Sequence, residues 1–374
     1  MNEGQTKNGH KALPLNVVQT DTQIFSLRFS SCGSFLLGAA MDSRVRRWRV
    51  SVAEPAPSGD PKAAASKKKS SEVCTLQELA PVEGFKGWVQ ALAVHDTGDG
   101  AVAADSWGGI VAWDACKEEL AVRWRVDAAH DGWVRQVALS PDGTRVVSCS
   151  RDGWVRLWDA RDGKKITEVH HAEEVYCVAF SNDGKRVACS DLHCNLILAE
   201  AETLKQQSRV ALAEFFLLSR MQEVTGLRQL RFAKDDATLV AVGSKPSSGG
   251  FVEGAPLWVE VDLSSGKARE SVKIGAAKDG FILDIARHPA GFHLGALSGQ
   301  PGMGRLIFFN EGAKEPFFSD PSLANCQSVA VDPTGKLAIV ACTSKGSNGN
   351  GKPLTKDGQY LPNTSPLHCF ALQG

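Results

Sequence analysis

The chain has 374 residues, of which 43% are hydrophobic and 22% are charged, and its formal net charge at pH 7 is zero. This composition is that of an ordinary globular protein, long enough to bury a large core in one or two domains. The charge balance argues against generic binding to nucleic acid or to anionic membranes, because both depend on an excess of positive charge.

The first predicted element is an isolated strand, LPLNVVQT at residues 13–20, which follows a polar segment that we expect to be a flexible N-terminus (1–10). That segment has no apolar stretch followed by a small-residue cleavage site, so we expect no signal peptide. No run of about 18 apolar residues occurs, so we expect no membrane span. Cysteines such as Cys149, Cys177 and Cys189 lie within apolar strand patterns, which favours a reducing, cytoplasmic location.

Seven similar strand–turn–strand units follow in chain order. In the third unit the turn is SPDG at residues 140–143, where Pro restricts φ and Gly accepts a positive φ. Successive turns are 65, 45, 41, 52, 55 and 44 residues apart. The basic unit of about 40–45 residues is typical of the four-stranded blades of β-propellers. The turn positions are Gly33, Gly98, Gly143, Gly184, Asp236, Gly291 and Gly335.

A second landmark supports the same register. Fifteen residues after the first four turn positions lie Trp48, Trp113, Trp158 and Ala199. We therefore predict an all-β fold, with residues 11–374 forming a single seven-bladed β-propeller of four-stranded antiparallel blades. Because the last unit ends after its third strand, the N-terminal strand should pair in the last blade and close the ring.

Two segments do not fit the repeat. Residues 53–71 are rich in Pro, Ala, Ser and Lys, and we expect a low-complexity loop inserted in blade 1. Residues 201–224 exceed a linker between blades. Part of them should form the fourth strand of blade 4, and residues 215–218 should form a helical turn packed on the propeller, with an exposed partner-binding patch as the alternative.

These units resemble the WD-repeat β-propellers, and the third unit is the most similar, with its SPDG turn and a Trp-Asp pair that begins at Trp158. The resemblance implies that Asp152 bonds to His130, that His130 bonds to Ser148, and that Ser148 accepts a hydrogen bond from the indole N–H of Trp158. In this interpretation the four side chains are a structural tetrad, and His130 and Asp152 are not catalytic.

Other units depart from the pattern. The second has Phe85 and Trp107 at the His and Asp positions, and the fourth keeps His171 but has His193 and Ala199 at the Asp and Trp positions. No tetrad can be assigned in units five to seven. The sequence contains no GxSxG nucleophile elbow and no CxxC or HxxxH spacing, so we expect no catalytic residues, no metal and no cofactor.

The resemblance implies that the loops entering the first strand of each blade share a rim with the loops between second and third strands. Aromatic and Arg residues, which are enriched in interfaces, cluster in these loops. The three longest loops between second and third strands also fall on this rim, and long loops on a rigid scaffold often carry recognition. The alternative for each Trp is packing between neighbouring blades. The predicted rim residues are Trp88, Trp107, Trp133, Arg135, Arg151 and Trp154.

We therefore predict a non-catalytic WD-repeat scaffold that binds a protein or peptide partner through this top rim. A membrane partner is not expected, and nothing in the charge supports a nucleic acid. The alternative is a propeller enzyme, such as a lactonase-like hydrolase, with a site at the mouth of the central channel. That alternative depends on blades 5–7, which depart most from the WD-repeat pattern.

Overall fold

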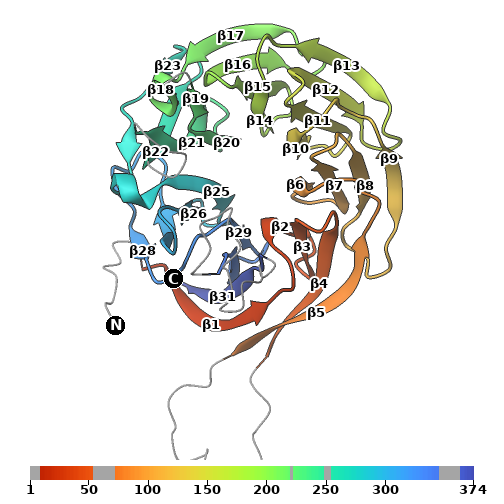
Figure 1. Cartoon of the computed structure of the whole chain (residues 1–374), viewed down its shortest axis with the longest axis vertical. Coiled ribbons are helices and arrows are strands. Elements are labelled where there is room, and N and C mark those ends of the chain that lie inside the picture. The colour runs from red at the N-terminus through yellow and green to blue at the C-terminus, as the bar shows by residue number, and fades with distance from the viewer. Residues whose placement is uncertain (1–8, 54–71, 220–221, 248–253, 345–362) are drawn as a thin grey trace, which may run out of the picture.

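The computed structural model contains seven antiparallel sheets arranged around a central channel (Figure 1). It describes residues 9–53, 72–219, 222–247, 254–344 and 363–374. The predicted all-β, seven-bladed propeller is therefore confirmed. Most of the predicted loop at 53–71 and of the N-terminal segment at 1–10 lies outside the described residues.

The first four blades each consist of four consecutive strands, ordered from the channel outward. Blade 1 contains β2 (Ile24–Phe29), β3 (Phe35–Ala40), β4 (Val45–Ala53) and β5 (Val73–Val82). Blade 2 contains β6 (Val89–Val94), β7 (Gly100–Asp105), β8 (Ile110–Asp114) and β9 (Val122–Val126). Blade 3 contains β10 (Val134–Leu139), β11 (Arg145–Ser150), β12 (Trp154–Asp159) and β13 (Lys165–His170). Blade 4 contains β14 (Val175–Phe180), β15 (Arg186–Asp191), β16 (Asn195–Glu200) and β17 (Gln206–Ala211).

The last three blades are less regular. Blade 5 contains β20 (Leu227–Phe232), β21 (Thr238–Pro246) and β22 (Gly254–Asp262), and its outer strand is divided into β23 (Lys267–Ala268) and β24 (Val272–Lys273). The 3₁₀ turn η3 (Ala277–Asp279) leads into blade 6, which contains β25 (Phe281–Arg287), β26 (His293–Ser298), β27 (Gly304–Phe309) and β28 (Phe318–Asp320). Blade 7 contains β29 (Ser328–Val331), β30 (Leu337–Ala341) and β31 (Pro366–Gln373).

The N-terminal strand β1 (Lys11–Gln19) is the outer strand of blade 7, as predicted. It pairs antiparallel with β31, from Lys11 opposite Gln373 to Gln19 opposite Pro366. The two ends of the described chain therefore lie in one sheet, and the ring closes without an open edge between first and last blades (Figure 1).

The insertion between blades 4 and 5 combines a turn and a hairpin. The 3₁₀ turn η2 (Ala213–Phe215) is followed by β18 (Phe216–Ser219) and β19 (Gln222–Thr225), which pair with each other. Phe215 is fully buried, whereas Leu218 is 64% exposed. The predicted helical turn is therefore displaced by a few residues, and the apolar residues after it extend as a strand.

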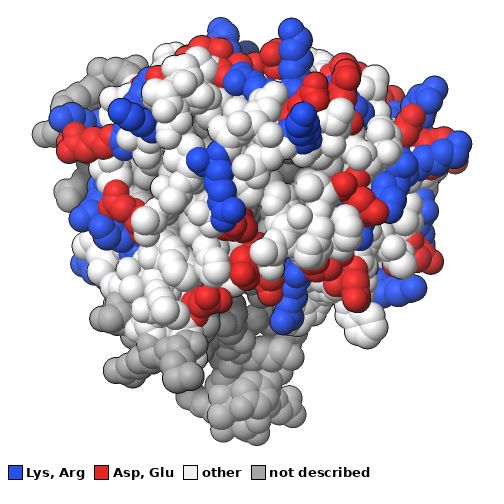
Figure 2. All heavy atoms as spheres, turned by 90° about the horizontal axis from the view of Figure 1, so that it is seen from above, with Lys and Arg blue, Asp and Glu red and all other residues white. Residues whose placement is uncertain are grey.

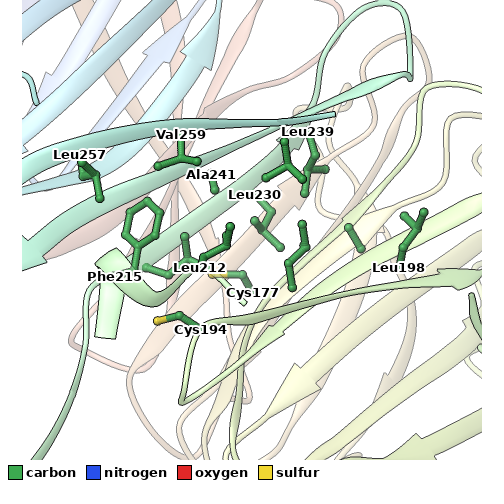
Figure 3. Packing of buried hydrophobic residues seen from close by; sticks show 14 of the residues in the cluster. Cys177, Cys194, Leu198, Leu212, Phe215, Leu230, Leu239, Ala241, Leu257 and Val259 are labelled. Carbon is green, nitrogen blue, oxygen red and sulfur yellow. The ribbon is translucent and has the colours of Figure 1, made fainter. Parts of the chain in front are cut away.

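The core consists of layers of apolar side chains between neighbouring blades, as expected for strands that are buried on both faces. Figure 3 shows the layer between blades 4 and 5, where Leu198 of β16 and Cys177 of β14 face Leu230 and Leu239 of blade 5. Phe215 closes this layer at its edge. Full burial of each such Leu or Phe stabilises the fold by about 1.5–3 kcal/mol, so packing between blades fixes their positions.

A polar hub also joins four blades across the channel. Asp284 of β25 is 3% exposed and accepts hydrogen bonds from Arg28 of blade 1 at 2.8 Å, from Gln229 of blade 5 and from the hydroxyl of Ser328 in blade 7. The backbone N–H of Val329 donates to the same carboxylate at 3.1 Å. This buried carboxylate helps to hold blades 1, 5, 6 and 7 in their ring.

Candidate functional site

The four residues of the expected tetrad lie in one chain of hydrogen bonds in blade 3. The indole N–H of Trp158 donates to Ser148 Oγ at 2.9 Å, and Ser148 Oγ lies 2.7 Å from His130 Nε2. His130 Nδ1 lies 3.1 Å from both carboxylate oxygens of Asp152. Arg156 also donates to Asp152 at 2.9 Å, an addition that sequence reasoning did not include.

Both ring nitrogens of His130 have partners. Ser148 Oγ accepts from Trp158, so its own hydrogen is available for His130 Nε2. His130 Nδ1 lies 3.1 Å from the carboxylate of Asp152 and 2.6 Å from Nη1 of Arg156. Burial lowers the pKa of His130 despite the opposing effect of Asp152. Burial would raise the pKa of Asp152, but hydrogen bonds from His130 and Arg156 outweigh it and hold that pKa well below its ordinary value. The pair is therefore a neutral imidazole beside a carboxylate, which serves to connect two loops.

Blade 2 makes the same loop connection with a different residue. Asp105 is 1% exposed and accepts hydrogen bonds from the backbone N–H groups of Lys86 at 2.7 Å and Gly109 at 2.8 Å. It lies two residues before the position where the pattern expects Asp, which sequence reasoning missed. The indole N–H of the buried Trp113 has no partner among the described residues, because Ala103 stands at the position of the blade 3 serine.

In blade 4, His171 Nε2 lies 3.9 Å from the thiol of Cys189, which replaces the serine hydroxyl. The carboxylate of Asp191, which is 4% exposed, accepts hydrogen bonds from Asn195. His193 lies away from this pair and contacts Glu223 of the inserted hairpin at 2.9 Å. The connection between loops therefore weakens from blade 3 to blade 4.

Four of the predicted rim residues lie close together near the start of the inner strands. The rings of Trp88 and Trp133 pack edge to face, with their centroids 6.2 Å apart. The guanidinium of Arg135 lies over the ring of Trp133 at 4.8 Å and over that of Tyr176 at 4.6 Å. Arg135 and Arg151 both bond to the carboxylate of Glu174, at 2.9 and 3.1 Å. Glu174 and Tyr176 were not among the predicted residues.

Exposure to solvent separates the rim residues at the surface from those beneath them. Trp88 is 46% exposed, Trp107 is 68% exposed, and the side chain of Arg151 is 66% exposed. A Cβ at Gly87 would lie 2.3 Å from Trp107 Cδ1, so the ring of Trp107 lies against the backbone next to Trp88. Trp133 is half-buried, and its indole N–H has no partner among the described residues.

Trp154 lies apart from this cluster. Its ring contacts His170, with centroids 4.9 Å apart, and lies 5.1 Å from the guanidinium of Arg156. His170 is directly opposite Trp154 on β13, the outer strand of blade 3. Trp154 therefore packs across strands toward the outside of the blade and does not join the other aromatic residues.

Further members of the surface lie at bulges in the inner strands. The pairing register shifts at the second residue of the inner strand in blades 1 to 5, which frees that side chain from the regular alternation. The rings of Phe25 and Trp88 pack together with their centroids 6.3 Å apart. The guanidinium carbon of Arg228 lies 4.4 Å from the centroid of the Phe281 ring. The signal was present in the sequence, because these positions precede each turn position by eight residues: Phe25, Gln90, Arg135, Tyr176 and Arg228.

We define the rim surface as Phe25, Trp88, Trp107, Trp133, Arg135, Arg151, Glu174 and Tyr176. It extends over blades 1 to 4 and combines aromatic rings with ion-paired arginines. Figure 2 shows the side of the propeller, where basic and acidic side chains are intermingled, in keeping with the net charge of zero. Such a mixed charge distribution gives no general attraction to a polyanion.

Among the described residues, no group of three or more His, Cys, Asp or Glu side chains is placed to hold a metal ion. No helix in the described part of the chain is long and apolar enough to cross a membrane. Two of the three long loops predicted on the rim, 244–256 and 343–366, lie partly outside the described residues, at 248–253 and 345–362.

Comparison with known proteins agrees with this geometry. The WD domain, G-beta repeat model matches residues 8–49, 124–159 and 163–197. The chain is 32% identical to the cross-pathway control WD-repeat protein 2 of Flammulina velutipes over 24% of its own length and 29% of that protein. It is 30% identical to the nuclear distribution protein PAC1 of Arthroderma otae, over 38% of the chain and 30% of that protein. It is also 30% identical to the methylosome protein WDR77 of Xenopus laevis, over 42% of the chain and 44% of that protein.

The matched repeats and the seven blades together identify the class of protein: the chain is a WD-repeat β-propeller. The matches cover less than half the length of each of these relatives.

Proposed function

We propose that this chain is a non-catalytic scaffold that binds a protein or peptide through the rim surface. The observation that carries the proposal is the pair of neighbouring, highly exposed Trp side chains, Trp88 and Trp107, beside the exposed Arg151. Large aromatic and Arg side chains supply most of the energy in protein interfaces. Exposure of two adjacent indoles to water is unfavourable in the free protein. A partner that covers both rings removes this cost, which favours binding.

The supporting layer beneath these residues favours a preformed surface. Arg135 is held between the rings of Trp133 and Tyr176 and is ion-paired with Glu174. Because these side chains already have partners, binding would cost less side-chain entropy than on a flexible loop. Glu174 also bonds to Arg151, so the exposed guanidinium is already oriented.

We also propose that residues 11–374 act as one domain and that the protein works in the cytoplasm. The sheet shared by β1 and β31 supports the domain boundary. The ten cysteines are free thiols, which suits a reducing compartment. The hydrolase alternative depends on loops of blades 5–7, and a lactone-hydrolysis screen with and without added divalent metals would detect it.

The proposal is tested with the triple variant Trp88→Ala, Trp107→Ala and Arg151→Ala in affinity purification with mass spectrometry from the native host. These side chains are exposed, so the variant should fold normally. The matched control is Val122→Ala with Ile166→Ala, which removes side chains that are 44% and 50% exposed on outer strands.

We expect the wild type and the outer-strand control to retain the same partners. The rim variant should lose them. Each hot-spot Trp contributes about 2 kcal/mol or more, which corresponds to about thirtyfold in affinity. Retention of every partner by the rim variant, or loss from the outer-strand control alone, would show that the rim is not the binding surface.

A further inference from the structure

Two cysteines meet on the face of the propeller opposite the rim surface. Cys32 lies in the turn between β2 and β3 of blade 1, and Cys116 follows β8 of blade 2. Both segments lie at the far end of the blades from the loops that enter the inner strands. The two side chains lie close together, because Ser31, the residue next to Cys32, contacts Cys116 Sγ at 3.3 Å, although 83 residues separate the two cysteines in the chain (33–115).

Neighbouring serines give the two sulfur atoms different roles. Ser30 Oγ accepts from the backbone N–H of Phe35 at 3.1 Å, which leaves its hydrogen for Cys32 Sγ at 3.2 Å. Ser31 donates its hydrogen to the carbonyl of Gly98 at 2.5 Å, so its oxygen can only accept from the thiol of Cys116 at 3.3 Å. Ser30 can therefore donate to the sulfur of Cys32, whereas Ser31 can only accept from the thiol of Cys116.

The acidities of the two thiols also differ. Partial burial would raise the pKa of Cys32, but hydrogen bonds from Ser30 and from the backbone of Ser34 outweigh it, and the pKa lies below its ordinary value. Partial burial and the neighbouring Cys32 raise the pKa of Cys116, and they outweigh the opposite effect of the contact with Ser31. The thiolate is the nucleophile in cysteine chemistry, so the pair combines a nucleophilic sulfur with a protonated neighbour.

Accessibility sets this pair apart from the other cysteines. Cys32 is exposed and Cys116 is half-buried, whereas the remaining eight cysteines are buried. Two further pairs are in contact, Cys326 with Cys342 at 3.7 Å and Cys74 with Cys369, but all four residues lie inside the core. An oxidant in solution therefore reaches Cys32 first.

We propose that Cys32 and Cys116 form a reversible thiol switch that responds to hydroperoxides. The thiolate of Cys32 attacks the peroxide O–O bond, so that sulfur is oxidised to sulfenic acid and the peroxide is reduced, releasing hydroxide or alkoxide. The thiol of Cys116 then attacks that sulfur and loses its proton to the departing hydroxyl, which forms the disulfide and water. A dithiol reductant restores both thiols by exchange.

The disulfide would join the inner turn of blade 1 to the outer loop of blade 2. It lies on the opposite face from the rim surface, so this inference does not depend on the proposed function. The product is a covalent link between adjacent blades, formed only under oxidising conditions.

The test treats the full chain with hydrogen peroxide, followed by alkylation and peptide mass spectrometry. We expect a linked Cys32–Cys116 peptide that has lost two hydrogens and that dithiothreitol separates. Cys116→Ser should instead accumulate sulfenic acid at Cys32, which dimedone traps, and Cys32→Ser should show neither product. The control Cys326→Ser, which breaks a buried pair, should still form the Cys32–Cys116 link.

A second measurement, alkylation of the reduced protein by iodoacetamide near pH 7, does not depend on the fold of a variant. Cys32 should react about tenfold faster or more than any buried cysteine. The inference is overturned if peroxide links other cysteines in preference to these two, if no linked peptide forms, or if Cys32 reacts no faster than the buried thiols.

Discussion

The hydrogen-bonded chain in blade 3 allows a quantitative prediction. Ser148 is fully buried, and its hydroxyl accepts from Trp158 and donates to His130. Replacing Ser148 with Ala leaves the indole N–H and the imidazole Nε2 in the core without partners. An unsatisfied buried polar group costs about 1–3 kcal/mol, so we expect Ser148→Ala to lower the free energy of unfolding by about 2–4 kcal/mol.

The matched control is Ser190→Ala in blade 4. Ser190 is equally buried, but its hydroxyl makes only a long contact, 3.5 Å, with the carbonyl of Asp191. Its replacement should cost less than about 1 kcal/mol. Urea denaturation followed by tryptophan fluorescence measures both variants against the wild type. If the Ser148→Ala and Ser190→Ala variants were equally stable, the hydrogen bonds of Ser148 would contribute nothing to the free energy of unfolding beyond the packing of its hydroxyl.

Three further predictions concern stability. Gly108 has φ of +95° and a Cβ there would lie 2.0 Å from the carbonyl oxygen of His130, whereas Gly132 has φ of +101° and open space around it. Gly132→Ala should therefore lower the free energy of unfolding by about 1–2 kcal/mol, measured by thermal or urea unfolding. Gly108→Ala should lower it by about 1–3 kcal/mol more, because its Cβ also meets the carbonyl oxygen of His130. Equal losses of stability in the two variants would contradict this steric contact. Asp284→Ala should lower the free energy of unfolding by about 2–4 kcal/mol in the same assay, because Arg28 loses its ion-pair partner. An unchanged unfolding midpoint would show that Asp284 does not hold the blades together. Burial lowers the pKa of His130 and His293, so the unfolded chain binds protons more readily as the pH falls through the ordinary value of 6.5. The thermal midpoint should therefore fall from about pH 7.5 to about pH 5, and a rise over that interval would contradict the burial of neutral histidines.

The repeat was readable from the sequence because each blade needs the same local chemistry. The turn residues, such as Gly143 with φ of +70°, occur wherever the chain reverses between the first two strands of a blade. The missing fourth strand of the last unit also indicated that β1 closes the ring. These features depend on short segments and on the period of the repeat, so one sequence suffices to recognise them.

Contacts between blades could not be read in the same way. Asp284 receives hydrogen bonds from blades 1, 5 and 7, which no spacing in the chain brings together. Asp105 connects its loops from a position two residues before the expected one. Trp154 shares a sequence context with Trp133, yet its side chain packs against the outer strand. The direction of a side chain depends on strand register and on neighbours, and a motif defines neither.

The most direct test of the central claim is hydrogen–deuterium exchange of the chain with and without a partner isolated by affinity purification. Binding through the rim surface predicts that amide protection concentrates at residues 86–90, 131–135 and 172–176. Protection confined to the turns at 30–34 and 140–144 of the opposite face, with the first three segments unchanged, would contradict it.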